Sequence, residues 1–245
     1  MVTLDARPEP LDVDPRRLAV LVVDMQNDFG ARGGMFDRAG IDIAGIEEAA
    51  ENTRAVLGAA RAAGLPVVYL TMEHSADLAD AGPADGPHRI KHAPLRLGEN
   101  VTAPDGSPGG ILVRDTWNTR ILDDLAPQPG DSIVSKHRYS GFFETDLDDV
   151  LRGLGAQALL VAGCTTSVCV EATVRDAMYR DYTCIVLEDC TAEPIGADQP
   201  QTNHDASLRV IQTLYGWISS SGSVLSALAA QTELEVTPAG RSRPE

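Results

Sequence analysis

Short apolar runs alternate with longer amphipathic segments along most of this chain. The runs predict β-strands at Leu18–Val23, Pro66–Thr71, Asp131–Ser135, Ala158–Ala162, Thr183–Leu187 and Trp217–Ser219. Helical spacing of apolar positions predicts helices at Ile43–Ala63, Asn118–Leu125, Asp146–Leu154, Val168–Tyr182, Asn203–Tyr215 and Val224–Ala230. Because strands that alternate with helices favour a parallel sheet covered on both faces, we expect an α/β fold. The predicted architecture is a doubly wound, three-layer α/β/α sandwich around a six-stranded, mainly parallel sheet.

The length of the chain predicts one principal domain. Its 245 residues are enough for one sizeable core, and α/β chains of this size usually form a single domain. We expect an N-terminal leader over residues 1–13, the domain over residues 14–230, and a flexible, polar C-terminal tail over residues 231–245. Residues 72–116 are rich in Gly, Pro, Asp and His. Since loops of this length in a compact domain are usually lids or binding loops, we expect this segment to line a substrate site.

Charge and composition exclude several classes of partner. The net charge of −16 argues against nucleic acid, because the sequence has no basic stripe to neutralise phosphates. No apolar run approaches the length of a membrane span, and the first 17 residues lack the apolar core of a signal peptide. The four cysteines have no paired spacing, which fits a reducing compartment. We therefore expect a cytoplasmic protein whose partner is a small molecule, with no nucleic-acid or membrane partner.

One cysteine lies where an apolar run gives way to a helical pattern. Cys169 follows the predicted strand through the small-residue segment 163–167 and opens the predicted helix. Free N–H groups and the dipole at a helix N-terminus lower the pKa of a nearby thiol. A buried, inert cysteine is the alternative, since free cysteines are usually of that kind.

Two further polar residues follow predicted strands in the same way. Asp24 comes directly after Leu18–Val23, and Lys136 comes directly after Asp131–Ser135. In open α/β sheets, ligands bind at the carboxyl edge, where the strand order reverses. Asp24, Lys136 and Cys169 together therefore predict a catalytic site, although each alone has an ordinary role as a cap or a solvated charge.

The segments that carry these three residues resemble the signatures of the isochorismatase-like cysteine hydrolases. The resemblance lies in residues Leu21–Phe29, Ser135–Phe143 and Gly163–Ala177, in the order that the family has them. Similarity extends over roughly residues 14–228, which is nearly the whole chain.

This resemblance implies a Cys-Lys-Asp triad. Cys169 would attack a carbonyl carbon, Asp24 would take the thiol proton and return it to the leaving amine, and Lys136 would favour the thiolate and orient the carboxylate. The family also has a non-proline cis peptide bond before the nucleophile, which corresponds here to Cys164–Thr165. The N–H groups of Thr165 and Cys169 would then form an oxyanion hole.

We expect neither a metal nor another cofactor. Nicotinamidases of this superfamily carry a metal motif with two histidines after the second strand, whereas residues Met72–Asp77 of this chain contain only His74. A zinc site needs three or four protein ligands.

The substrate class is implied by a closer resemblance within the superfamily. Residues Pro127–Asp131, Arg138–Phe143 and Tyr215–Trp217 are similar to amidohydrolases of the ureidoacrylate type, while Glu73–Asp80 looks more like the biuret-hydrolysing relatives. The resemblance implies cleavage of an amide C–N bond in a small ureido or carbamoyl compound, of the ureidoacrylate, biuret or N-carbamoyl type. An acyl-cysteine intermediate would form and ammonia would be released.

Several aromatic and basic residues are candidates for contact with such a substrate. Tyr139 follows Lys136 by three positions at the same sheet edge, and Phe29 and Trp117 could form pocket walls. Residues in the predicted lid that could bind a carboxylate are His74, Arg89 and His92.

Two other functions remain as alternatives. Vinyl-ether hydrolysis of the isochorismatase type needs no nucleophile, so Cys169 argues against it. A non-catalytic protein that uses the fold for interactions should tolerate loss of a triad member, and all three are present here. Members of the superfamily are commonly homodimers or homotetramers, and we expect one of these states.

Overall fold

The computed structural model describes residues 1–236, with side chains described up to Gln231. Its centre is a sheet of six strands in the order β10-β9-β8-β3-β4-β7, and every neighbouring pair is parallel. The strands are β3 (Leu18–Val23), β4 (Val67–Met72), β7 (Ser132–Lys136), β8 (Ala158–Cys164), β9 (Thr183–Ala192) and β10 (Trp217–Ser219). All six predicted strands are present, and the predicted α/β sandwich is confirmed.

The strand order reverses beside β3. The chain proceeds from β3 to β4 and β7 on one side, and then returns to place β8 on the other side of β3, followed by β9 and β10. The carboxyl ends of β3 and β8 are therefore neighbours at the switch point, with Val23 opposite Gly163. Parallel sheets of this kind bind ligands in the crevice outside this point.

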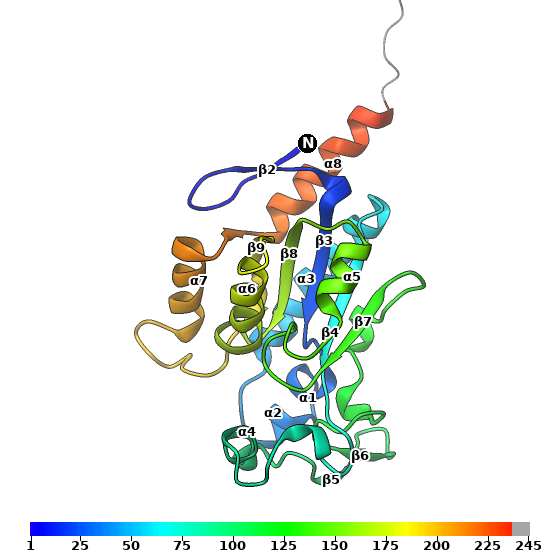
Figure 1. Ribbon diagram of the computed structural model, residues 1–245, viewed down its shortest axis with the longest axis vertical. Helices are drawn as coiled ribbons and strands as arrows, with labels where there is room; N and C mark the ends of the chain where they lie inside the picture. Colours follow the sequence, from blue (N-terminus) through cyan, green and yellow to red (C-terminus); the bar gives the residue numbers. More distant parts are fainter. Residues whose placement is uncertain (237–245) are drawn as a thin grey trace, which may run out of the picture.

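Helices cover both faces of the sheet (Figure 1), and alternate side chains of β3 face opposite layers. In β3, Leu18, Val20 and Val22 belong to the cluster of buried apolar residues under α3 and α8, while Ala19, Leu21 and Val23 belong to the cluster under α5, α6 and α7. The continuous apolar runs of the sequence reflect this burial on both faces. The helices are α3 (Ala44–Ala62), α5 (Leu147–Gly153), α6 (Glu171–Met178), α7 (Asn203–Leu214) and α8 (Ser221–Val236).

The first 13 residues pack against the domain. Strands β1 (Val2–Leu4) and β2 (Leu11–Val13) form an antiparallel pair, and Val2, Leu4 and Val13 are buried in the core. The backbone N–H of Arg7 donates to the carbonyl of Ile218, next to the sheet. The segment expected to be a leader is thus held in place by apolar burial, because every second residue of β1 faces inward.

Residues 72–116 contain short elements at the carboxyl edge of the sheet. These are α4 (Pro87–His92), β5 (Asn100–Thr102) and β6 (Pro108–Gly110), the last two paired antiparallel. Helices α1 (Asn27–Gly30) and α2 (Met35–Arg38), which the apolar pattern did not predict, lie at the same end of the molecule (Figure 1).

The predicted helix over Asn118–Leu125 is wrong. The structure has two short 3-10 turns there, Trp117–Thr119 and Asp123–Leu125. Between these turns the backbone hydrogen-bonds to the segment that follows β3 and does not form helical hydrogen bonds. The N–H of Leu122 donates to the carbonyl of Met25, and the N–H of Asn27 donates to the carbonyl of Arg120. Tertiary hydrogen bonds have replaced the helical ones.

The C-terminal helix is longer than the sequence pattern indicated. Helix α8 continues to Val236, so the first part of the expected tail over residues 231–245 is helical, and residues 237–245 lie outside the described residues. Across the described part of the chain, no helix combines the length and apolarity needed to cross a bilayer.

Gly163 permits the close approach of β8 and β3 at the switch point. Its φ of +132° is a conformation that L-residues rarely adopt, and a Cβ added there would lie 2.1 Å from the carbonyl oxygen of Val23. Any side chain would therefore force the two strands apart beside the candidate site.

We expect Gly163→Ala to lower the free energy of unfolding by roughly 1–3 kcal/mol, the usual cost of forcing extra volume and a strained backbone into a packed region. The matched control is Gly58→Ala, because Gly58 lies within α3 and has open space around its Cα. That substitution should raise stability by about 0.5–1 kcal/mol. Denaturant unfolding measures both, and equal effects of the two substitutions would contradict this account.

Candidate active site

Asp24 begins the site, immediately after β3. Its backbone has a positive φ of 52°, which Asp tolerates better than most residues, and its N–H donates to the carbonyl of Leu70. The side chain is fully buried, and its Oδ2 lies 2.7 Å from the Nζ of Lys136. The other oxygen, Oδ1, is buried and accepts no hydrogen bond from the described residues. One oxygen of the carboxylate is therefore held by a cation while the other is available.

Lys136, at the end of β7, is as buried as its partner. Its Nζ also donates to the carbonyl oxygen of Arg138 at 3.1 Å and contacts the sulfur of Met72 at 3.7 Å. Burial opposes the charged form, but the negative charge of Asp24 and the hydrogen bond to it outweigh burial and raise the pKa of Lys136. Burial also raises the pKa of Asp24, although Lys136 and the Cys169 thiol oppose this shift. A carboxylate with a raised pKa is suited to accept and return a proton near neutral pH.

Cys169 lies on a π-helical turn, Thr166–Val170, between β8 and α6, and it is buried. Burial, followed by the charge of Asp24, raises the pKa of its thiol, and the positive charge of Lys136 only partly offsets the shift. The sequence argument from the helix N-terminus expected a lower pKa. Burial of the thiol and the nearby charge of Asp24 act in the opposite direction.

The backbone before Cys169 has an unusual geometry. The peptide bond Cys164–Thr165 is cis, and the sulfur of Cys164 lies 3.1 Å from the carbonyl oxygen of Asp24. Thr165 and Cys169 both line the pocket described below. The residues expected to supply oxyanion donors are therefore on the pocket wall.

A buried carboxylate supports the turn that carries Cys169. Glu193, just after β9, accepts hydrogen bonds from the N–H of Ser167 at 2.9 Å and from its hydroxyl at 2.5 Å. The other oxygen of Glu193 accepts from the N–H of Ile195 at 3.0 Å. Glu193 thus connects the nucleophile turn to Ile195, a residue of the pocket wall. The sequence analysis did not identify it, because an isolated glutamate has no local signature.

The residues after Asp24 attach the 110–119 segment to the site. The Gln26 side chain hydrogen-bonds the backbone of Met72 and the carbonyl of Thr119, and Asn27 donates to the carbonyl of Trp117. Asp28 is buried and accepts from the backbone N–H groups of Met35 and Leu112 and from Asn118. Burial raises its pKa to about 6 despite these donors. The polar side chains that follow Asp24 therefore hold the 110–119 segment in place beside the site.

A pocket of about 180 Å³ opens onto Cys169. This volume corresponds to about six liquid water molecules, so it suits a small ligand. Its wall is mainly apolar, including Phe29, Met35, Phe36, Met72, Leu95 and Val168. Polar groups come from Tyr139, Thr165, Lys91 and His92, the last two from α4. The structure brings the predicted residues Phe29, Tyr139 and Cys169 together here.

His74 and Trp117 lie outside this wall. His74 is fully buried, with Nδ1 3.1 Å from Asp80, and its Nε2 faces the Nε2 of His88 at 3.5 Å. The backbone carbonyl of Trp117 accepts a hydrogen bond from the Asn27 side chain. His74 therefore helps to attach α4 to the domain. Within the residues described, no three His, Cys, Asp or Glu side chains converge as a metal site.

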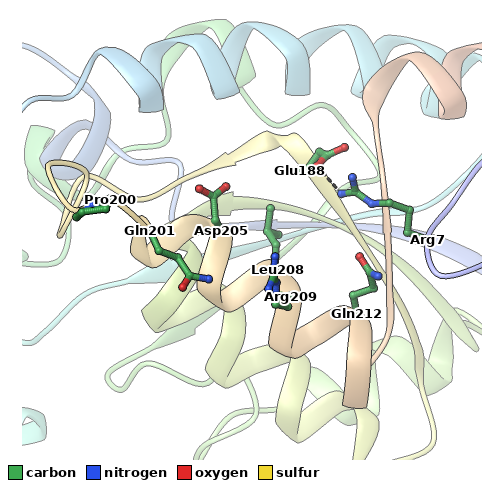
Figure 2. A pocket seen from close by; sticks show the side chains of 8 residues that line it. All are labelled: Arg7, Glu188, Pro200, Gln201, Asp205, Leu208, Arg209 and Gln212. Carbon is green, nitrogen blue, oxygen red and sulfur yellow. Dashed lines mark hydrogen bonds and ion pairs between the residues drawn. The ribbon is translucent and has the colours of Figure 1, made fainter.

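A wider hollow lies elsewhere, beside α7 (Figure 2). It has a volume of about 640 Å³ and is lined by polar and charged side chains, among them the ion pair Arg7–Glu188 at 2.6 Å. Cys169 lines the smaller pocket and not this hollow, so the candidate nucleophile faces the smaller pocket.

Comparison with known proteins identifies the family. The model of the isochorismatase domain matches residues 18–223, which is most of the chain. This chain belongs to the isochorismatase family. The recognition made from the three sequence segments is confirmed.

Named relatives extend over nearly the whole chain. It is 40% identical over 234 residues to the ureidoacrylate amidohydrolase of Rhizobium rhizogenes, a match covering 95% of this chain and 92% of that protein. It is 41% identical over 220 residues to the ureidoacrylate amidohydrolase of Caulobacter vibrioides, covering 90% of each.

Two solved structures have a similar fold. A cysteine hydrolase from Pseudomonas syringae pv. phaseolicola matches with a TM-score of 0.74 at 30% identity, covering 90% of this chain and 96% of that one. The N-carbamoylsarcosine amidase of Thermoplasma acidophilum matches with a TM-score of 0.61 at 27% identity, covering 84% and 96%.

The histidines that attach α4 predict a loss of stability in acid. Burial lowers the pKa of His74 to about 4, and burial together with nearby positive charge lowers that of His88 to about 3. Both rings are neutral in the fold, while the unfolded chain binds protons from about pH 6.5 downward. The contribution to stability is therefore complete above pH 6.5 and is lost as the pH falls from 6.5 towards 4.

Thermal unfolding between pH 7 and pH 4.5 measures this effect. In His74→Gln the decrease of Tm with falling pH should be smaller than in the unchanged protein. Thr213→Ala is the control, because Thr213 is an exposed residue of α7 whose side chain binds no proton, and this substitution should leave the decrease unaltered. Equal decreases in all three proteins would contradict the assignment.

Proposed function

We propose that this protein is a metal-independent cysteine amidohydrolase that cleaves the C–N bond of a small ureido or carbamoyl compound. The observation that carries the proposal is the buried Asp24–Lys136 pair, 2.7 Å apart, next to Cys169 at the end of a small pocket. A nucleophile, a proton acceptor and a fixed positive charge are the parts that covalent amide hydrolysis requires.

The first half of the reaction forms an acyl-enzyme. The raised pKa of the Cys169 thiol means that it is protonated in the free enzyme, so the proton moves to Asp24 as sulfur attacks the carbonyl carbon. The new C–S bond gives a tetrahedral intermediate with a negatively charged oxygen. Asp24 then delivers the proton to the departing nitrogen, the C–N bond breaks, and ammonia leaves.

The second half regenerates the enzyme. Asp24 takes a proton from water, and the resulting hydroxide attacks the acyl carbon. The C–S bond then breaks, and the Cys169 sulfur recovers the proton from Asp24. The product is a carbamate when the substrate is a urea. Throughout, Lys136 keeps a positive charge beside the carboxylate and the sulfur, which favours the states in which either carries negative charge.

Two backbone N–H groups are suited to stabilise the intermediate. Thr165, directly before the turn, and Cys169, on the turn, both line the pocket, and we assign their N–H groups as the oxyanion hole. A donor of this kind typically contributes about 2.7–4 kcal/mol to transition-state stabilisation.

The substrate class rests on the relatives and on the pocket. The similar proteins named above are ureidoacrylate amidohydrolases and an N-carbamoylsarcosine amidase, and both names specify a carbamoylated nitrogen. The pocket volume of about 180 Å³ supports a small substrate such as a ureido or carbamoyl compound. Residues 72–116 supply part of its wall through α4, which supports their role as a substrate lid.

Substitution of the nucleophile tests the covalent mechanism. We expect Cys169→Ala to lower kcat by at least about 10³-fold in an assay of ammonia release from a panel of small ureido compounds, because the acyl-enzyme cannot form. Cys184→Ala is the control, since Cys184 is a buried residue of β9 that does not line the pocket. Retained activity in Cys169→Ala would refute the mechanism.

Chelation tests the absence of a metal from the chemistry. We expect activity to be unchanged after dialysis against EDTA, because the proposed steps use only side chains and backbone groups. Loss of activity on dialysis that is restored by a divalent cation would overturn this part of the proposal.

A further inference from the structure

The lid contributes two consecutive polar residues to an otherwise apolar pocket wall. Lys91 and His92, at the end of α4, line the same 180 Å³ cavity as Cys169. The lining residues include no Asp or Glu. A substrate rich in hydrogen-bonding groups, such as a urea, therefore meets few side-chain partners beyond those of the triad. Which nitrogen of His92 carries a hydrogen then decides whether this residue donates or accepts a hydrogen bond in the pocket.

The position of the hydrogen on His92 follows from its contacts. Its Nδ1 lies 2.9 Å from the carbonyl oxygen of His88. Because a carbonyl oxygen only accepts, Nδ1 must carry the hydrogen and donate it. In a neutral ring the other nitrogen, Nε2, then has a free lone pair and acts as an acceptor.

The surroundings of His92 favour the neutral ring. Its side chain is buried, with 6% exposed, and burial lowers its pKa. The positive charges of Arg138 and Lys136 lower it further, although the bond to the His88 carbonyl opposes the shift. Among residues 1–231, Nε2 of His92 has no hydrogen-bond partner, so an acceptor on the pocket wall is left for a ligand.

The orientation of the ring is fixed by neighbouring rings. The centroid of His92 lies 4.1 Å from that of His88 and 5.7 Å from that of Tyr139. His88 in turn contacts His74, which is anchored by Asp80. The acceptor is thus preorganised, as a specificity-determining group must be.

We propose that His92 determines substrate specificity by accepting, at Nε2, a hydrogen bond from the internal N–H of a monosubstituted urea. This N–H lies on the side of the carbonyl opposite the amino group that leaves, so it remains in the pocket while ammonia departs. The inference rests on the proposed function and narrows it. Ureas that carry a hydrogen on the internal nitrogen are substrates, and those with an alkyl group there are rejected, because the alkyl group removes the donor and leaves Nε2 desolvated.

N-carbamoylglycine and N-carbamoylsarcosine are the matched probes, because they differ only by a methyl group on that nitrogen. We expect the unchanged enzyme to prefer N-carbamoylglycine by roughly ten- to a hundred-fold in kcat/KM. In His92→Phe, which keeps a ring but has no acceptor, the ratio should fall close to one. His92→Asn, which offers an amide oxygen, should retain part of the preference.

Lys91→Met is the control, since both probes carry the same carboxylate. It should change kcat/KM for the two compounds by the same factor and leave their ratio intact. A preference for N-carbamoylglycine that persists in His92→Phe, or equal turnover of both probes by the unchanged enzyme, would overturn the proposal. If neither probe is hydrolysed, the proposed function fails for these compounds, and calorimetric binding of the same pair to the same variants replaces kinetics.

A second measurement does not depend on turnover. The ¹⁵N chemical shifts of His92 at pH 7 should identify a neutral ring with hydrogen on Nδ1. They should change at Nε2 when N-carbamoylglycine is added to Cys169→Ser, but not when N-carbamoylsarcosine is added. A ring protonated at Nε2 would refute the inference even in an active enzyme.

Discussion

The buried ion pair between Asp24 and Lys136 is the constraint on which the rest of the site depends. Two charges at 2.7 Å, both fully buried, are expensive to remove from water and are tolerated only when each is well paired. The fold meets this condition by ending β3 and β7 at the same edge and by giving the ammonium the carbonyl of Arg138. Oδ1 of Asp24, which has no hydrogen-bond partner among the described residues, is the atom best suited to take a proton.

Support for this pair comes from residues that do no chemistry. Gln26 and Asp28 attach the 110–119 segment to the end of β3, and Glu193 fixes the turn that carries Cys169. Each of these side chains is buried and hydrogen-bonds backbone groups of a segment distant in sequence. Such contacts hold a reactive constellation in one geometry, which is how a site becomes preorganised.

Burial shifts the pKa of the Cys169 thiol and the pKa values of the lid histidines in opposite directions. It raises the pKa of the Cys169 thiol and so favours attack coupled to proton transfer over a preformed thiolate. It lowers the pKa of the lid histidines, which leaves neutral rings with defined acceptors. The same removal of water that makes the candidate nucleophile harder to ionise therefore also favours uncharged lid histidines, as the proposed specificity for an uncharged ureido group requires.

The sequence by itself determined the six strands, the parallel sheet and the edge at which Asp24, Lys136 and Cys169 gather, because apolar periodicity and strand-end positions are local properties of the chain. It also carried the family resemblance, since each of the three similar segments is a continuous stretch of the chain. Only the tertiary structure decided that residues 118–125 are not a helix, that residues 2–13 are packed on the domain, and that His74 supports the lid while His92 lines the pocket. It also decided the pKa of Cys169 and the hydrogen position on His92. These features depend on burial and on hydrogen bonds between residues far apart in sequence, which no local pattern encodes.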